Sequence, residues 1–276
     1  GTLNYNNTLA TGSYSETIGS VSLASGQFNV ALGNNVTGTQ TLTLSGLARA
    51  ATTSGSQATV TFSSASGLAA TAAGNRIAVA GAGTTTSGSI VGPWATVGTS
   101  AATPTDYAVY SGGFVVPANY AVSSESAWLS GSNAVFNSGT ALTASRTVNT
   151  LRYSGAAAAT GTLTGFQLAT NGLLNGSTGV LTLAGGTLTT PSGGGNLFLA
   201  ANGGLTISST IADNSGAVTL VKSGPGTLTL SGSNSFTGGV VLNGGNLTTT
   251  ADSNLGGAAS GITVNGVSQW DWTNQI

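Results

Sequence analysis

Short alternations of apolar residues with threonine recur along the C-terminal half of the chain. Residues 226–230 read Gly-Thr-Leu-Thr-Leu, and residues 245–249 read Gly-Asn-Leu-Thr-Thr. A period of two places the leucines on one side of a β-strand and the threonines on the other. The glycines and asparagines between these segments tolerate the positive φ angles that tight bends require. The pattern therefore predicts short strands joined by tight turns, without helices.

The spacing of these segments distinguishes between all-β architectures. Related segments are Val180–Leu183, Thr187–Thr189, Leu205–Ile207 and Ile262–Val264. The glycines that precede such segments recur at nearly regular intervals: Gly186, Gly204, Gly226 and Gly245. Sandwiches and barrels also space their strands at about 8–12 residues. However, similar short segments that return about every 20 residues are typical of the coils of a parallel β-helix.

We therefore expect an all-β chain that forms one β-solenoid over residues 1–276 and is most regular over residues 179–264. Leucine, isoleucine and valine would stack inside the coils, and asparagines at the corners would form amide ladders between them. Residues 87–130 break the rhythm, because they are rich in aromatic residues and contain three of the five prolines. We interpret this region as irregular coils or an insertion, with the solenoid continuing through it.

Residues 220–249 carry the most specific motif, Leu-Val-Lys-Ser-Gly-Pro-Gly-Thr-Leu-Thr-Leu-Ser-Gly followed by Ser-Asn-Ser-Phe-Thr-Gly-Gly and a third glycine-rich turn. This stretch resembles the autotransporter-associated β-strand repeat, and Lys222, Gly226, Asn234 and Phe236 lie at positions of that motif. The resemblance implies a right-handed parallel β-helix in a secreted bacterial surface protein, often an adhesin or a stalk. It brings no catalytic residues with it.

Charge excludes several classes of partner. The chain has five basic and six acidic residues in 276, a net charge of −1, and no histidine or cysteine. A surface with so few cations cannot neutralise a run of phosphates, so we expect no nucleic-acid partner. No polybasic segment or long apolar run is present, and we expect no direct membrane insertion. Without cysteine, disulfides and thiolate metal sites are excluded.

Enzymatic chemistry finds little support in the sequence. The acidic residues are scattered, at Glu16, Asp106, Glu125, Asp213, Asp252 and Asp271. Glycosidases need two carboxylates about 5–9.5 Å apart. Only Asp213 and Asp252 have a spacing, of about two coils, that would place them on one face, and both lie in turn-forming sequences. Calcium needs six to eight oxygen ligands. We therefore predict no catalytic residues, no metal site and no cofactor.

Two sets of aromatic and apolar residues are candidate contact sites. Trp94, Tyr107, Tyr110 and Trp128 are candidates for stacking on a surface glycan, with the alternative that their rings cover the core beneath a long loop. Near the chain ends, Leu3, Tyr5, Trp270 and Trp272 are candidates for end-to-end contact. An uncapped solenoid exposes unpaired backbone, which a further repeat or a second copy would cover. Head-to-tail stacking of copies would give a filament.

The sequence thus favours a secreted structural or adhesive β-solenoid on the bacterial cell surface, acting as a stalk or an extracellular fibre. Its partners would be further repeats of the same chain, another copy stacked head to tail, or surface glycans. The alternative is a β-helix that binds or cleaves carbohydrate.

Overall fold

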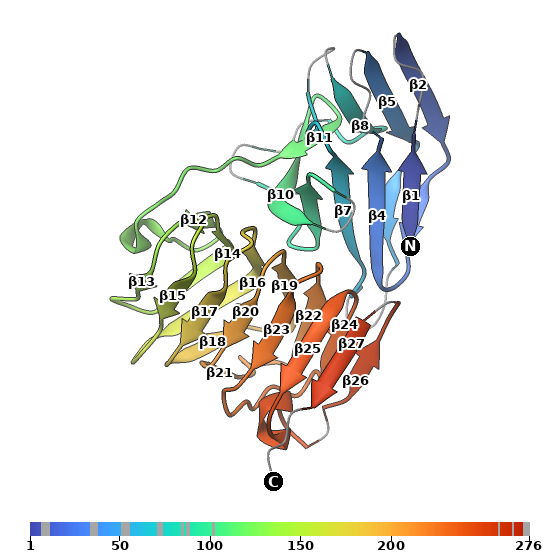
Figure 1. Cartoon of the computed structure of the whole chain (residues 1–276). Coiled ribbons are helices and arrows are strands. Elements are labelled where there is room, and N and C mark those ends of the chain that lie inside the picture. Colours follow the sequence, from blue (N-terminus) through green and yellow to red (C-terminus); the bar gives the residue numbers. More distant parts are fainter. Residues whose placement is uncertain are drawn as a thin grey trace. The chain divides into compact units, whose positions relative to one another are not determined.

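The computed structural model describes residues 1–6, 12–33, 38–50, 56–70, 74–83, 86, 89–100, 103–258, 260–266 and 268–272. The chain divides into two compact units, Gly1–Asn119 and Tyr120–Ile276 (Figure 1). The boundary falls inside the region 87–130 that the sequence marks as irregular. Strands dominate both units, and the predicted all-β, parallel β-solenoid fold is confirmed.

Helices are a minor feature of the chain. Within the described ranges the helices are the short 3₁₀ elements η1 (Glu125–Ala127) and η2 (Asp252–Leu255). Neither one is long and apolar enough to cross a membrane.

The first unit begins with coils of three parallel strands. The first coil contains β1 (Thr2–Tyr5), β2 (Ser13–Ile18) and β3 (Val21–Leu23), and the second contains β4 (Gln27–Leu32), β5 (Thr39–Leu44) and β6 (Leu47–Arg49). The third continues with β7 (Thr59–Ser64) and β8 (Asn75–Val79). Thr2 pairs with Asn29 and Ser13 with Thr39, each one coil further along the chain. These coils are longer than the C-terminal repeats lead us to expect.

An antiparallel hairpin closes the first unit. Strand β9 (Ala95–Gly98) lies parallel to β7, but β10 (Pro104–Ser111) runs antiparallel to both β9 and β11 (Phe114–Pro117). Strand β11 in turn pairs antiparallel with β8, so the hairpin joins the two main sheets of this unit. Gly112 and Gly113 form the turn with φ angles of 58° and 84°, which only glycine adopts easily. This reversal differs from the predicted continuation of parallel coils through residues 87–130.

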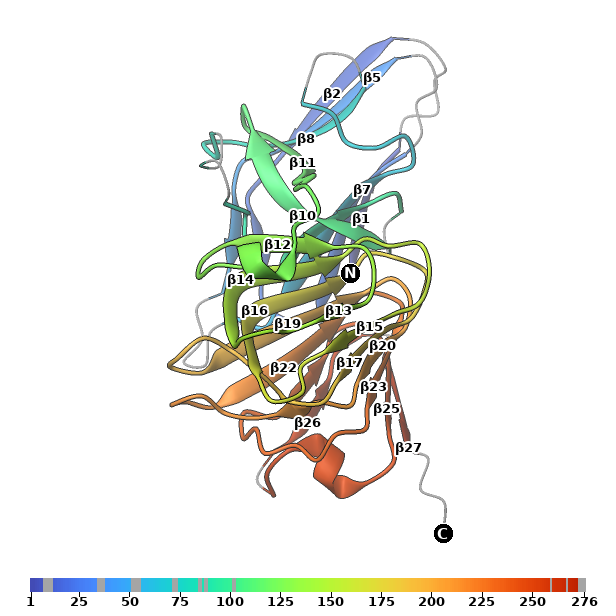
Figure 2. The same cartoon turned by 90° about the vertical axis from the view of Figure 1, so that its left-hand side faces the viewer.

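The second unit is a stack of parallel coils with two main sheets (Figure 2). One sheet, here called the β12 sheet, runs in the order β12 (Asn133–Phe136), β14 (Arg146–Tyr153), β16 (Gln167–Asn175), β19 (Gly195–Ala201), β22 (Val218–Ser223), β24 (Val240–Leu242) and β26 (Ile262–Val264). The other, here called the β13 sheet, runs β13 (Thr140–Ala141), β15 (Ala159–Thr162), β17 (Leu181–Ala184), β20 (Leu205–Ile207), β23 (Thr227–Leu230), β25 (Gly245–Thr249) and β27 (Ser268–Trp272). Two short strands, β18 (Thr187–Thr189) and β21 (Thr210–Ile211), pair with each other beside β16.

Register in the β13 sheet explains the leucine–threonine alternation. Leu205 pairs with Leu228 and Leu228 with Leu247, so these three successive coils bring a leucine to the same place in the sheet. All three leucines are fully buried. Burial of one leucine side chain contributes about 1.5–3 kcal/mol. The threonines between them point outward, as the alternation predicts.

Strands β19, β22 and β24 of the β12 sheet carry apolar residues on both sides. Leu197, Leu220 and Val240 point into the coils, whereas Phe198, Val221 and Val241 occupy the alternate positions. The last three are also buried, with at most 8% of their surface exposed. The outward positions of the β12 sheet therefore mix buried apolar side chains with polar ones such as Asn196 and Thr219, whereas those of the central strands of the β13 sheet are threonines.

Asparagine ladders connect successive coils, as the sequence predicts. The Nδ2 of Asn149 donates to Oδ1 of Asn133 at 2.8 Å, and the Nδ2 of Asn171 donates to Oδ1 of Asn149 at 3.2 Å. A second ladder joins Asn265 to Asn243 at 2.9 Å. An amide can both donate and accept, so Asn149 bonds to the coils on either side of it.

Candidate functional site

The aromatic candidates of the first unit lie against its core. Tyr107 in β10 is only 2% exposed. Trp94 and Tyr110 are half-buried and pack on the hydrophobic core of this unit. The guanidinium of Arg49 lies 4.8 Å from the centre of the Trp94 ring. Tyr107 therefore has no exposed ring face for a sugar, and stacking by Trp94 or Tyr110 stays a prediction.

Trp128 covers the first coil of the second unit. It is 2% exposed, its ring centre lies 5.8 Å from that of Phe136, and Phe136 lies 5.1 Å from Tyr153. Tilted aromatic pairs at these distances are favourable beyond the area they bury. This placement matches the alternative weighed for Trp128, a ring that covers the core.

An ion pair fixes the segment that carries Trp128. Glu125, in η1, accepts hydrogen bonds from Nε of Arg146 at 2.5 Å and from its Nη2 at 3.0 Å. Thr143 adds a backbone and a hydroxyl donor at 3.2 and 2.8 Å. The hydrogen bonds from Arg146, ahead of those from Thr143, lower the pKa of Glu125 to about 2. The carboxylate thus connects η1 to the loop before β14, through Thr143, and to the start of β14, through Arg146.

Two other carboxylates also have structural roles. Asp106 accepts hydrogen bonds from the backbone N–H groups of Tyr107 and Asn119, at 2.8 and 2.9 Å. Asp213 accepts from the N–H groups of Val218 and Thr237 and from the Thr237 hydroxyl. Desolvation opposes ionisation of Asp213, but these hydrogen bonds outweigh it and hold the pKa of that carboxyl below its usual range. Asp213 therefore stabilises a corner of the coil and the neighbouring coil at Thr237, as its turn-forming sequence indicates.

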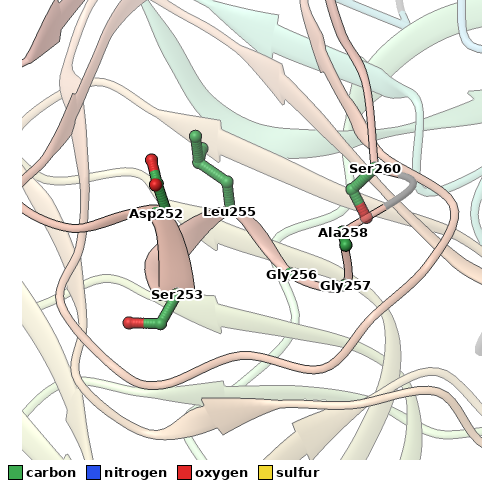
Figure 3. Close-up of a pocket in the computed structure, with 7 residues that line it drawn as sticks. All are labelled: Asp252, Ser253, Leu255, Gly256, Gly257, Ala258 and Ser260. Atoms are coloured by element: carbon green, nitrogen blue, oxygen red, sulfur yellow. The ribbon is translucent and has the colours of Figure 1, made fainter.

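A pocket lies beside η2 (Figure 3). Its lining contains Asp252, Ser253, Leu255, Gly256, Gly257, Ala258 and Ser260. Asp252 is the one carboxylate among them, and the hydroxyl of Ser260 donates to the carbonyl of Phe236 at 3.0 Å. The two carboxyl groups that glycoside cleavage requires are not brought together in this lining. Across the described ranges, no group of three or more His, Cys, Asp or Glu side chains is placed to hold a metal ion.

The candidate end residues lie on outermost strands. Leu3 and Tyr5 in β1 are half-buried and stand in register with Val30 and Leu32. At the other end, Trp270 is 40% exposed and in register with Leu247, so it extends the inward leucine column. Val264 in β26 is 50% exposed. The backbone of Trp272 pairs with Thr249, but its side chain lies outside the part of the chain that the structure describes.

Lys222 is the least expected residue in the core. It points inward between Leu199 and Leu242, and it is fully buried. Its Nζ donates to the carbonyls of Ser223 at 2.7 Å, Gly224 at 2.9 Å and Gly244 at 3.2 Å. Burial lowers the pKa of Lys222 to about 7, while three carbonyls match the three N–H donors of an ammonium group. One side chain thus holds the corners of two successive coils.

The glycines at this corner allow the coils to approach closely. A Cβ on Gly245, whose φ is 71°, would collide with the carbonyl oxygen of Gly224 and would lie 2.9 Å from Nζ of Lys222. A Cβ on Gly226 would collide with the carbonyl oxygen of Gly203. Both positions therefore require glycine for space, and Gly245 requires it for conformation as well.

Asn234 plays the matching role at the next corner. Its Oδ1 accepts from the N–H of Ile211 at 2.7 Å, and its Nδ2 donates to the carbonyl of Asn254 at 2.6 Å. Asn254 in turn donates to the carbonyl of Gly232 at 2.9 Å. Phe236 is fully buried in the same core. The motif residues thus lock three successive coils together.

Comparison with known families agrees with this geometry, because residues 220–248 match the family model of the passenger-associated-transport-repeat. The chain carries this transport repeat. The predicted resemblance is confirmed, and the repeat spans β23 and β24 and parts of β22 and β25. Lys222, Asn234 and Phe236 are its structural residues.

The whole chain is also similar to a curated protein. It is 34% identical, over an alignment of 286 residues that takes in 94% of this chain, to the Adhesin BmaC autotransporter of Brucella suis biovar 1 (strain 1330). The chain spans 8% of the length of that protein. No solved structure matches the chain significantly.

Because Lys222 bonds three carbonyls at the corners of two coils, we expect its substitution to lower the free energy of unfolding strongly. Lys222→Met keeps a long apolar stem but leaves the three carbonyl oxygens without their donor, so we expect the free energy of unfolding to fall by about 2–4 kcal/mol. Urea denaturation of the full chain measures this change. The outward Thr206→Val is the control, with an expected change within about 0.5 kcal/mol. If the urea midpoint of Lys222→Met equals that of the wild type, the hydrogen bonds of Lys222 do not stabilise the two corners, and this account of Lys222 is contradicted.

Proposed function

We propose that this chain is a structural and adhesive segment of an autotransporter passenger exposed on a bacterial cell surface, and that it is not an enzyme. The observation that carries the proposal is the stack of parallel coils, in which residues 220–248 match the transport repeat. The 34% identity to a protein named as an autotransporter adhesin supports it. An outer surface built from repeated coils offers a long array of similar contacts, which suits adhesion and support better than it suits catalysis.

The use of the ionisable residues supports a non-enzymatic role. Catalytic acids and bases need freedom to exchange protons with a substrate in a cleft. Here Lys222 donates to backbone carbonyls, Glu125 is paired with Arg146, and Asp213 accepts from backbone N–H groups and the Thr237 hydroxyl. A carbohydrate-cleaving role gains no support from these residues.

The proposal includes a further coil packed on the β26–β27 edge, from more repeats of the same polypeptide or from a second copy. Within the described residues, β26 pairs only with β24 and β27 only with β25. The edge also carries the exposed apolar side chains of Val264 and Trp270. A coil in the same parallel register would continue both sheets and bury these two side chains.

Adhesion is tested with the purified, fluorescently labelled chain on mammalian epithelial cells, measured by flow cytometry. We expect saturable binding that excess unlabelled chain displaces. Leu228→Asp is the matched control, because a carboxylate in the leucine column disrupts the solenoid and should abolish binding. Absence of saturable binding by the folded chain to several cell types would contradict the adhesive part of the proposal.

Stacking is tested by electron microscopy of the chain at rising concentration. If a second copy occupies the edge, filaments should form and should be lost in a Val264→Asp, Trp270→Asp variant, which places two charges in the contact. Discrete particles at every concentration would rule out stacking between copies.

A further inference from the structure

Threonines form a continuous column on the outer side of the β13 sheet. Thr160 pairs with Thr182, Thr182 with Thr206, Thr206 with Thr229 and Thr229 with Thr248. The column therefore extends over five consecutive strands, and Asp271 follows Thr248 in the same register. Neighbouring strands lie ~4.8 Å apart. The side chains thus present one hydroxyl per coil along a line.

These hydroxyls have no partner within the described part of the chain. Thr182, Thr206, Thr229 and Thr248 are half-buried, Thr160 is exposed, and none of their hydroxyls makes a hydrogen bond to another described residue. Thr61 and Thr96 of the first unit differ, because their buried hydroxyls bond to each other at 3.0 Å. Hydroxyls without internal partners are satisfied by water or by a ligand.

The face around the column is almost free of charge. Among the outward positions of the β13 sheet that the structure describes, Asp271 is the one ionisable residue, and its carboxylate accepts a hydrogen bond from Gln269. Thr227 and Asn246 flank the column on its last two strands, β23 and β25, and add further neutral polar groups. A ligand that carries repeated negative charge would find no cation here.

We propose that the threonine column binds a neutral polysaccharide chain that lies along the solenoid. Each hydroxyl both donates and accepts hydrogen bonds, as do the hydroxyl groups of a sugar. A polymer that repeats such groups along a line matches a surface that repeats them once per coil, and several weak contacts then add up along one ligand. This inference deepens the adhesive function proposed above and rests on it, because it names the class of surface molecule that is bound.

The test compares two triple variants of the full chain in affinity electrophoresis against soluble neutral β-glucan, mannan and galactan, with heparin as the anionic polymer. We expect wild type to be retarded by at least one neutral polymer. Thr182→Val, Thr206→Val, Thr229→Val removes three hydroxyls and keeps the β-branched shape, so affinity should fall at least about tenfold. The corresponding triple serine variant keeps the hydroxyls and should bind within about threefold of wild type.

A matched control removes three hydroxyls elsewhere. Thr17→Val, Thr39→Val, Thr43→Val changes outward threonines of β2 and β5 and should leave affinity unchanged. Circular dichroism and thermal melting of every variant confirm the fold. Retention by heparin alone, by no neutral polymer, or equally by wild type and the column valine variant would overturn the inference.

The same variants separate this inference from the proposed function. Cell binding that survives in the column valine variant contradicts the polysaccharide site but leaves adhesion standing. Absence of cell binding by wild type, together with retention by a neutral polymer that the valine variant loses, contradicts adhesion to those cells and supports the site.

Discussion

In-register stacking of parallel coils is the constraint on which the rest of this structure depends. The central coils of the second unit must place their leucines directly against one another, as Leu205, Leu228 and Leu247 do. A slip of one residue would turn these leucines outward and bring the threonines into the core. The corners fix the register, because Gly226 and Gly245 leave no room for a Cβ and Lys222 bonds carbonyls of two successive coils.

The scarcity of buried charge follows from the same constraint. A core that is only one coil wide leaves few positions where an ion can be satisfied, and the buried ions of the second unit sit at corners and ends. Lys222 is surrounded by carbonyls, and Glu125 is paired with Arg146. The outer side of the β13 sheet is also almost uncharged and is rich in hydroxyl groups. Such a surface suits repeated contacts with uncharged molecules better than proton transfer or phosphate binding.

The sequence predicts the repeating part of the fold well, because period and turn chemistry are local properties. The predicted strand Thr227–Leu230 matches β23, and the expected coil length matches the pairing of Thr227 with Asn246. The hairpin of the first unit was missed, although Gly112-Gly113 between Tyr110 and Phe114 is itself a hairpin signal.

Contacts between coils could not be predicted in this way. The bond from Arg146 to Glu125 cannot be read from local pattern, since it exists only once the chain has coiled. Outward threonines were predicted, but their alignment over five strands depends on unequal coil lengths that only the structure fixes.

Disulfide trapping tests the in-register stack most directly, and the absence of native cysteine makes the result unambiguous. In a Thr206→Cys, Thr229→Cys variant, the paired Cα atoms lie ~4.8 Å apart, within the range that a disulfide spans. In a Thr206→Cys, Thr227→Cys variant they are about 8 Å apart, beyond that range. Mild oxidation of the folded chain should therefore cross-link the first pair rapidly and the second hardly at all, as read by gel mobility and mass spectrometry. Equal cross-linking of both pairs, or preferential cross-linking of the second, would contradict the register and the account built on it.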